Sequence, residues 1–181
     1  MSFFVDNSNP TPVIIGHSNL TEGSGIVEFQ CTGSFDLNWE DGISSYFWTL
    51  KKSTELGSVT IDSSVSYDPT PFMLDTNLSG KYEISLTVTD YAGNFASTTV
   101  TVVVNNTPPL AVLSIGGKEY FDGDTVSVNR DLPISLDASG STDTANDIPT
   151  LRYVWRIDNV PFFEGSNRDL SWPDNSTSEF E

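Results

Sequence analysis

Residues Lys81-Tyr-Glu-Ile-Ser-Leu-Thr-Val-Thr89 alternate strictly between apolar and polar side chains. One face carries large apolar residues, Tyr82, Ile84, Leu86 and Val88, and the other carries Glu, Ser and Thr. A period of two predicts a β-strand, and a single apolar face is typical of an antiparallel strand that is buried on one side. The stretch therefore predicts a protein built from sheets, with its core on the apolar side of this strand.

Further strands are predicted on both sides of this stretch. After the turn Asp90–Asn94, in which Asp, Gly and Asn favour a tight reversal, alternation resumes over Ser97–Val104. Before it, the same pattern predicts strands at Pro12–Gly16, Gly25–Thr32 and Ser45–Lys51, with weaker candidates at Ser58–Asp62 and Ser66–Pro69. No stretch of comparable length has a helical period, so the expected class is all-β.

A shift of 107 positions, the difference between Trp48 and Trp155, superimposes two parts of the chain without a gap. The matched positions are Val27, Phe29 and Cys31 with Ile134, Leu136 and Ala138, Gly33-Ser34 with Gly140-Ser141, Asp36 with Asp143, and Tyr46 with Tyr153. Internal repetition at this spacing predicts a domain of about 100 residues that is used at least twice.

The second copy is expected to be incomplete. Its strands are predicted at Leu110–Ile115, Ile134–Ala138 and Arg152–Asp158, with an inserted hairpin that pairs Lys118–Phe121 with Thr125–Val128 around Asp122-Gly-Asp124. No counterpart of the Lys81–Thr89 strand follows Phe163. The predicted organisation is an N-terminal linker (1–9), a first sandwich (10–104), a proline-rich linker (105–109) and a second sandwich that lacks its C-terminal strands (110–181).

The net charge of −17, from 25 acidic and 8 basic residues, repels phosphate backbones and argues against nucleic-acid binding. The same acidity either keeps the protein soluble or holds cations. The single cysteine, Cys31, lies in an apolar strand and is expected in the core. The sequence contains neither a signal peptide nor a membrane span, and we expect it to be an excerpt of a longer chain.

Two spaced motifs resemble the pattern of polycystic kidney disease (PKD) domains. The first is Tyr46-x-Trp48-x-Leu50 followed by Tyr82-x-Ile-x-Leu-x-Val-x-Asp90-x-x-Gly93, and the second is Asp137-Ala-Ser-Gly-Ser-Thr-Asp143 followed by Tyr153-x-Trp155. The resemblance implies tandem immunoglobulin-like antiparallel β-sandwiches of an extracellular protein, the second one incomplete. In place of the family's glycine- and aspartate-rich segment, this chain has Lys51–Gly57 and Asn159–Gly165.

Aromatic residues divide into two groups. Those within predicted strands are expected in the core: Tyr46, Trp48, Tyr82, Tyr153 and Trp155. Phe35, Trp39 and Trp172 lie outside the clear alternation, so they either contact a sugar or a protein partner or close the ends of the sandwiches by packing.

The loop before each Tyr-x-Trp strand is rich in oxygen ligands. The first unit offers Asp36, Asn38, Glu40 and Asp41, and the second offers Asp143, Asn146 and Asp147. An Asn-x-x-Pro precedes each unit, at Asn7 and at Asn105. The resemblance implies calcium held between linker and loop, as in PKD-like domains of secreted collagenases. The alternative is that these residues cap turns and face water. No other cofactor is expected.

An enzyme is not expected, because the chain has one histidine and lacks a nucleophile elbow or a His/Cys metal motif. The predicted function is a structural or adhesive module of a cell-surface, cell-wall or S-layer protein that contacts neighbouring repeats, other proteins or glycans. The alternative is an accessory carbohydrate- or protein-binding module of a secreted hydrolase. Asn19, Asn77, Asn105 and Asn175 are glycosylation candidates in a secreted protein. Self-assembly by strand donation is also open.

Overall fold

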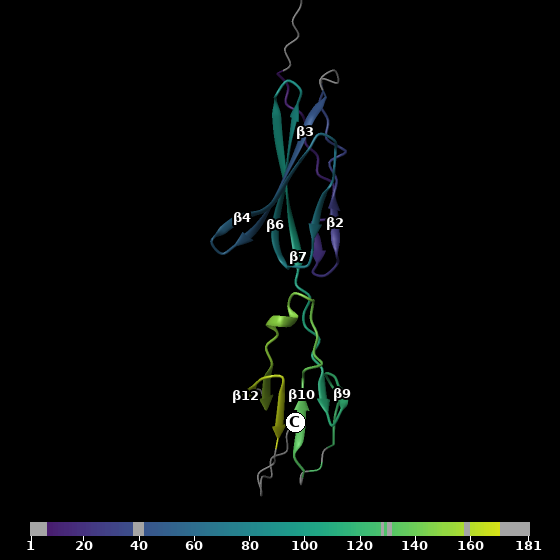
Figure 1. The fold of residues 1–181 in the computed structure, drawn as a ribbon, viewed down its shortest axis with the longest axis vertical. Helices are drawn as coiled ribbons and strands as arrows, with labels where there is room; N and C mark the ends of the chain where they lie inside the picture. Colours follow the sequence, from purple (N-terminus) through teal and green to yellow (C-terminus); the bar gives the residue numbers. More distant parts are fainter. Residues whose placement is uncertain (1–6, 38–41, 128, 130–131, 158–159, 171–181) are drawn as a thin grey trace, which may run out of the picture. The chain divides into compact units, whose positions relative to one another are not determined.

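A computed structural model describes residues 7–37, 42–127, 129, 132–157 and 160–170 (Figure 1). Within these ranges the chain is all-β, as expected, with a short 3-10 turn at Ile148–Thr150 and several sheets. It divides into two compact units, Met1–Thr107 (unit 1) and Pro108–Glu181 (unit 2). Each unit is described by itself.

Unit 1 contains a five-stranded sheet in the order β1-β7-β6-β3-β4 (Figure 1). The strands are β1 (Asn19–Thr21), β3 (Ile43–Thr54), β4 (Gly57–Ser66), β6 (Gly80–Asp90) and β7 (Phe95–Asn105). Neighbours are antiparallel except β1, which runs parallel to β7. A second, two-stranded sheet pairs β2 (Ile26–Phe29) with β5 (Phe72–Asp75). Both sheets supply core residues, an arrangement consistent with a β-sandwich.

The core of unit 1 is built on the alternating face of β6. Tyr82, Ile84, Leu86 and Val88 are each at most 3% exposed. Trp48 of β3 is 1% exposed, and its ring centroid lies 5.9 Å from that of Phe72. The Trp48 indole Nε1 donates a hydrogen bond of 3.1 Å to the carbonyl of Thr70, so the polar end of this buried ring has a partner.

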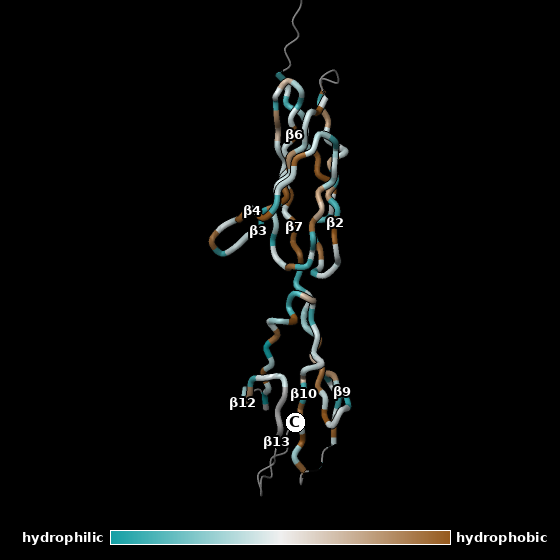
Figure 2. Tube along the Cα trace, viewed as in Figure 1, coloured by the Kyte–Doolittle hydropathy of each residue, from teal (hydrophilic) through white to brown (hydrophobic). Residues whose placement is uncertain are grey.

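β3 and β4 form one long hairpin, whereas the sequence pattern predicts a strand that ends at Lys51 and two weaker strands after it. The predicted break arose because β4 is exposed on both faces and lacks a regular apolar alternation. Residues Lys51–Gly57 form the end of β3 and the turn of this hairpin. Figure 2 shows hydrophobic positions along the hairpin. Its exposed hydrophobic residues include Leu56, Val59 and Ile61.

Two other predictions for unit 1 need correction. β5 was missed, because only Phe72 and Leu74 signal its alternation, although both are buried in the structure. The strand predicted at Pro12–Gly16 is reduced to isolated pairs, Thr11 with Phe35 and Ile15 with Gln30. The segment thus follows the edge of the smaller sheet without forming a continuous ladder.

Unit 2 contains a four-stranded sheet in the order β13-β10-β8-β9 and a separate pair, β11-β12 (Figure 1). The strands are β8 (Leu113–Ile115), β9 (Lys118–Tyr120), β10 (Ile134–Asp137), β11 (Val154–Ile157), β12 (Val160–Glu164) and β13 (Asn167–Leu170). Val112 and Leu136 are its buried hydrophobic residues in the described part of the unit. Among the described residues, the core of unit 2 is therefore much smaller than that of unit 1.

The hairpin predicted around Asp122-Gly-Asp124 is wrong in its pairing. β9 pairs with β8 across Gly116-Gly117, whose φ values of 60° and 80° suit a tight two-residue hairpin turn. The Asp122–Asp124 segment instead closes a local turn, in which the Phe121 amide donates to Asp124 Oδ2 at 2.9 Å. Asp124 therefore caps its own turn, and no strand is present in residues 121–127.

The same local hydrogen-bond pattern occurs once in each unit. The Val13 amide donates to Ser34 Oγ at 2.9 Å, and Ser34 Oγ donates back to the Val13 carbonyl at 3.4 Å. Val112 and Ser141 repeat both bonds, at 3.0 and 3.3 Å. Ser34 and Ser141 are matched by the 107-position shift, so a feature found by sequence repetition has the same local structure twice.

Candidate functional site

The oxygen-rich loop predicted in unit 1 lies only partly in the described residues. Asp36 is half-buried beside the Thr11–Phe35 pair, while Asn7 is exposed upstream of it. The remaining predicted ligands, Asn38, Glu40 and Asp41, lie outside the described residues. The pairing at Thr11 brings the segment that follows Asn7 next to the loop, and the calcium site there stays a prediction.

The corresponding loop of unit 2 is organised as a turn. Asp143 Oδ1 accepts the Thr144 amide at 2.8 Å, and the Asp147 amide donates to the Thr144 carbonyl at 2.9 Å. The 3-10 turn begins directly after Asp147. Asn146 is exposed, and across the described ranges no three His, Cys, Asp or Glu residues gather into a metal-binding group.

Asn105, predicted as a linker ligand, is the last residue of β7. Its Nδ2 donates to Asn19 Oδ1 at 2.6 Å and to the Leu20 carbonyl at 3.0 Å. Two predicted glycosylation positions, Asn19 and Asn105, are thus in contact, and both are exposed, as is Asn77. Asn175 lies outside the described residues.

Of the aromatics predicted as contact residues, Phe35 is 47% exposed at the Thr11 pair. Trp39 and Trp172 lie outside the described residues. Phe35 is therefore exposed to solvent, and its role as a contact residue stays a prediction.

A junction that the sequence did not predict is formed by the buried carboxylate of Glu22, which is 4% exposed. Its Oε1 accepts the Ser79 amide at 3.2 Å and its Oε2 accepts the Thr107 amide at 3.4 Å. The Glu22 amide donates to the Asn105 carbonyl at 2.8 Å. Glu22 thereby ties the end of β1 to the end of β7. A glutamate in a Thr-Glu-Gly turn carries no periodic signal, so only the structure reveals it.

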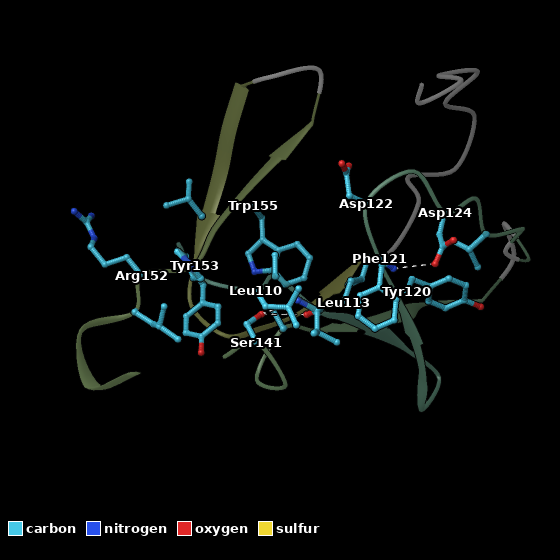
Figure 3. Close-up of a pocket in the computed structure, with 17 residues that line it drawn as sticks. Leu110, Leu113, Tyr120, Phe121, Asp122, Asp124, Ser141, Arg152, Tyr153 and Trp155 are labelled. Carbon is cyan, nitrogen blue, oxygen red and sulfur yellow. Dashed lines mark hydrogen bonds between the residues drawn. The ribbon is translucent and has the colours of Figure 1, made fainter. Parts of the chain in front are cut away.

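A cavity of about 690 Å³ lies within unit 2 (Figure 3). Its lining is mostly apolar and aromatic, and includes Leu110, Val112, Leu113, Tyr120, Tyr153 and Trp155. Figure 3 shows Arg152 at one end of the lining and Asp122 with Asp124 at the other. The volume falls in the range of binding pockets, and the lining suits an apolar occupant with a polar or charged edge.

Two residues predicted in the core of unit 2 line this cavity. Tyr153 and Trp155 are half-buried, whereas Tyr46 and Trp48, their counterparts at the 107-position shift, are 7% and 1% exposed. The Trp155 indole Nε1 donates to the Gly165 carbonyl at 2.8 Å, so its ring is held in place. The aromatic face that is covered in unit 1 is therefore partly open in unit 2.

Comparison with the models of known protein families gives no match, and comparison with curated proteins gives none either. No helix in the described ranges has the length and hydropathy needed to cross a membrane.

Proposed function

We propose that this chain is a non-enzymatic structural and adhesive module of an extracellular surface protein, built from tandem immunoglobulin-like sandwiches of the PKD kind. The observation that carries the proposal is the repetition itself. The Val–Ser double hydrogen bond, the Gly-Ser pair and the Tyr-x-Trp strand all occur twice. Repeated units of this kind serve to extend a molecule and to present surfaces along it.

The way in which unit 1 joins its two ends supports a spacing role. β1 and β7 run parallel, with Asn19 opposite Val103 and Thr21 opposite Asn105. Tension applied to the two ends of unit 1 pulls these strands in opposite directions along their length. The hydrogen bonds between β1 and β7, together with those of Glu22, are then loaded at the same time. They must break together and do not open one after another.

The acidic surface and the exposed sequons support an extracellular setting. Asn19 and Asn77 are exposed and accessible to modification in a secreted chain. The net charge of −17 keeps such a protein soluble and separate from other acidic polymers.

Single-molecule stretching of the full chain, held by its two ends, tests the spacing role. We expect unit 1 to unfold in one step that releases about 300 Å for residues 19–105, at about 3.5 Å per residue. Glu22→Gln is expected to lower the force of this step, because the buried carboxylate loses its charge-assisted bonds. Glu55→Gln, at the exposed turn of the β3–β4 hairpin, is the matched control and is expected to leave the force unchanged.

Extension without a step of this length, or an equal effect of the two variants, would contradict the spacing role. The adhesive role has its own measurement, the capture of protein-coated and glycan-coated surfaces by beads that carry the folded chain. Capture equal to that by beads carrying the heat-unfolded chain would count against it.

A further inference from the structure

The edge strand β4 of unit 1 leaves a long line of backbone groups uncovered. All ten of its residues are described, and all are exposed except Ser66, which is half-buried. β3 pairs with one edge of β4, and within the described ranges no strand pairs with the other edge. Figure 1 shows the β3–β4 hairpin extending away from the rest of the sheet of unit 1. Unpaired backbone groups on an edge strand are a template for another strand.

β4 lacks most of the features that protect an edge strand. Natural edge strands are often short and carry lysine or proline. β4 is ten residues long, contains neither lysine nor proline, and has one charged residue, Asp62. The bulge in its pairing with β3 lies between Leu50 and Lys51, so residues 62–66 form an uninterrupted run. This run can therefore accept a further strand.

The side chains along this edge are apolar and accessible. Val59, Ile61 and Val65 are 54%, 52% and 64% exposed, and the adjoining Tyr67 is 80% exposed. Val65 lies opposite Phe47 of β3, which is 43% exposed. These side chains offer on the order of 600 Å² per copy, so two such surfaces bury about 1,200 Å², the lower end of the range for specific interfaces. The area suits a weak, reversible dimer.

Local charge permits a second copy of this chain to approach here. The chain carries a net charge of −17, so most of the surface of one copy repels that of another. Residues 43–66 contain Lys51, Lys52, Glu55 and Asp62, two positive and two negative charges, and are therefore neutral. Two copies that meet along β4 bring together neutral segments of an otherwise acidic protein.

The sequence of β4 also matches itself when its direction is reversed. Positions at equal distances from Ser63 are alike in polarity, and the pairs are Asp62 with Ser64, Ile61 with Val65, Thr60 with Ser66, and Val59 with Tyr67. An antiparallel copy centred on Ser63 therefore places Ile61 opposite Val65 twice and keeps the two Asp62 residues from lying opposite each other. Such self-matching suits a two-fold axis, at which both copies use the same surface.

We propose that two copies of the chain associate through β4, which pairs antiparallel with β4 of the second copy about Ser63 and joins the two five-stranded sheets. The inference goes beyond the spacing role, because it assigns unit 1 an interaction surface and a partner. It does not depend on unit 2.

Analytical ultracentrifugation of the full chain tests the association. We expect a reversible dimer with a Kd on the order of 10 to 100 μM, because the interface is small. Raising the salt concentration from about 0.05 to 0.3 M is expected to strengthen the dimer, because salt screens the repulsion between acidic copies. Hydrogen exchange above the Kd is expected to show new protection in β4 and none in β2.

Two double variants localise the interface. Ile61→Lys with Val65→Lys places like charges opposite each other at the proposed edge, and is expected to weaken the dimer at least about tenfold. Ile26→Lys with Met73→Lys is the matched control on the smaller sheet, because it adds the same charge at residues that are 68% and 54% exposed. The control is expected to leave the Kd unchanged.

Asp62 tests the centre of the pairing. The Ser63 amide donates to Asp62 Oδ1 at 2.7 Å, a local bond that association must replace. Asp62→Ala removes this bond together with a negative charge near the axis, and is expected to tighten the dimer at least about threefold. A weaker dimer would contradict the proposed register.

Crosslinking by cysteine tests the register directly. Opposite residues of an antiparallel pair have Cα atoms about 4.5 to 5.5 Å apart, within the range of a disulfide. With oxidised glutathione, Ser63→Cys is expected to give at least about tenfold more reducible dimer than Ser58→Cys, which this pairing places opposite Asp68. The native Cys31 is buried and is not expected to crosslink.

A chain that stays monomeric up to about 1 mM, equal Kd values for the two double variants, or equal crosslinking at positions 63 and 58 would overturn the proposal. A monomer that binds phosphatidylcholine vesicles through the hairpin would overturn it as well, and would assign this edge to a membrane surface. Stretching is measured on single chains, so a failed dimer is distinguishable from a failed spacing role.

Discussion

At the scale of single residues, buried side chains whose polar atoms are hydrogen-bonded contribute to the stability of unit 1. Trp48 packs against Phe72 and donates to Thr70. Asp90, 2% exposed, accepts the Asn94 amide with Oδ1 and the Asn94 side-chain amide with Oδ2. The turn after β6 is thus held by the same aspartate that the sequence singled out for it.

Replacing Trp48 with Ala is expected to destabilise unit 1 by about 3 to 5 kcal/mol, because it opens a large cavity at the centre of the core. Phe47→Ala is the control on the same strand, since Phe47 is 43% exposed on the opposite face. That change is expected to cost about 1 kcal/mol or less. Denaturant unfolding of the two variants measures the difference, and similar losses would argue against the assigned core.

Cys31 reports on the same core through its ionisation. Burial raises the pKa of its thiol, and its side chain is fully buried. The folded state therefore binds this proton more tightly than the unfolded state. The contribution to stability is present below the ordinary thiol pKa and is lost as pH rises through the raised value. Tyr46 has a raised pKa as well, caused by burial and then by Cys31 and Asp68.

We expect iodoacetamide to label Cys31 in the native chain far more slowly than in the unfolded chain at alkaline pH, because only the thiolate reacts. We also expect the free energy of unfolding of unit 1 to fall at alkaline pH. Cys31→Ala is expected to remove the part of this fall that comes from the thiol and to leave the part that comes from Tyr46. Native labelling at the unfolded rate would place the thiol outside the core.

At the scale of elements, the strands with the longest clean alternation were the ones the sequence predicted best. β6 and β7 lie close to their predicted positions, because one buried face imposes a period of two. β4 was predicted as two weaker strands and β5 was missed, and the two errors have different causes. β4 is exposed on both faces, and β5 is too short for a pattern to emerge.

The calcium and contact sites could not be predicted to the same degree, because they depend on loops. Whether Asp143 and Asp147 bind an ion or hold a turn depends on backbone geometry that a sequence pattern does not specify. In the structure both take part in the turn before Ile148. The Glu22 junction was invisible for a related reason, since its partners come from two segments that are distant in sequence, Ser79 and Asn105–Thr107.

Glu22→Gln is expected to destabilise unit 1 by about 1 to 3 kcal/mol, because a buried carboxylate that accepts two amides is replaced by a group with only one acceptor oxygen. Thermal unfolding beside Glu55→Gln checks this. A variant as stable as the wild type would show that the junction between β1 and β7 adds nothing to the fold.

At the scale of the whole molecule, the two units share the Tyr-x-Trp strand but differ in how far this strand is covered. In unit 1 the Tyr-x-Trp strand is paired on both edges and buried. In unit 2 the matching strand is paired with β12 and faces an apolar cavity. The same sequence pattern thus lies in a closed core in unit 1 and lines a partly open apolar cavity in unit 2.

Hydrogen exchange of the full chain, followed by mass spectrometry, tests this difference most directly. The amides of β3 and β6 are expected to exchange most slowly, and those of Val154–Ile157 roughly tenfold faster or more, because fewer buried contacts protect them. Protection of Val154–Ile157 equal to that of β3 would contradict the difference between the units, because the two Tyr-x-Trp strands would then be covered to the same degree.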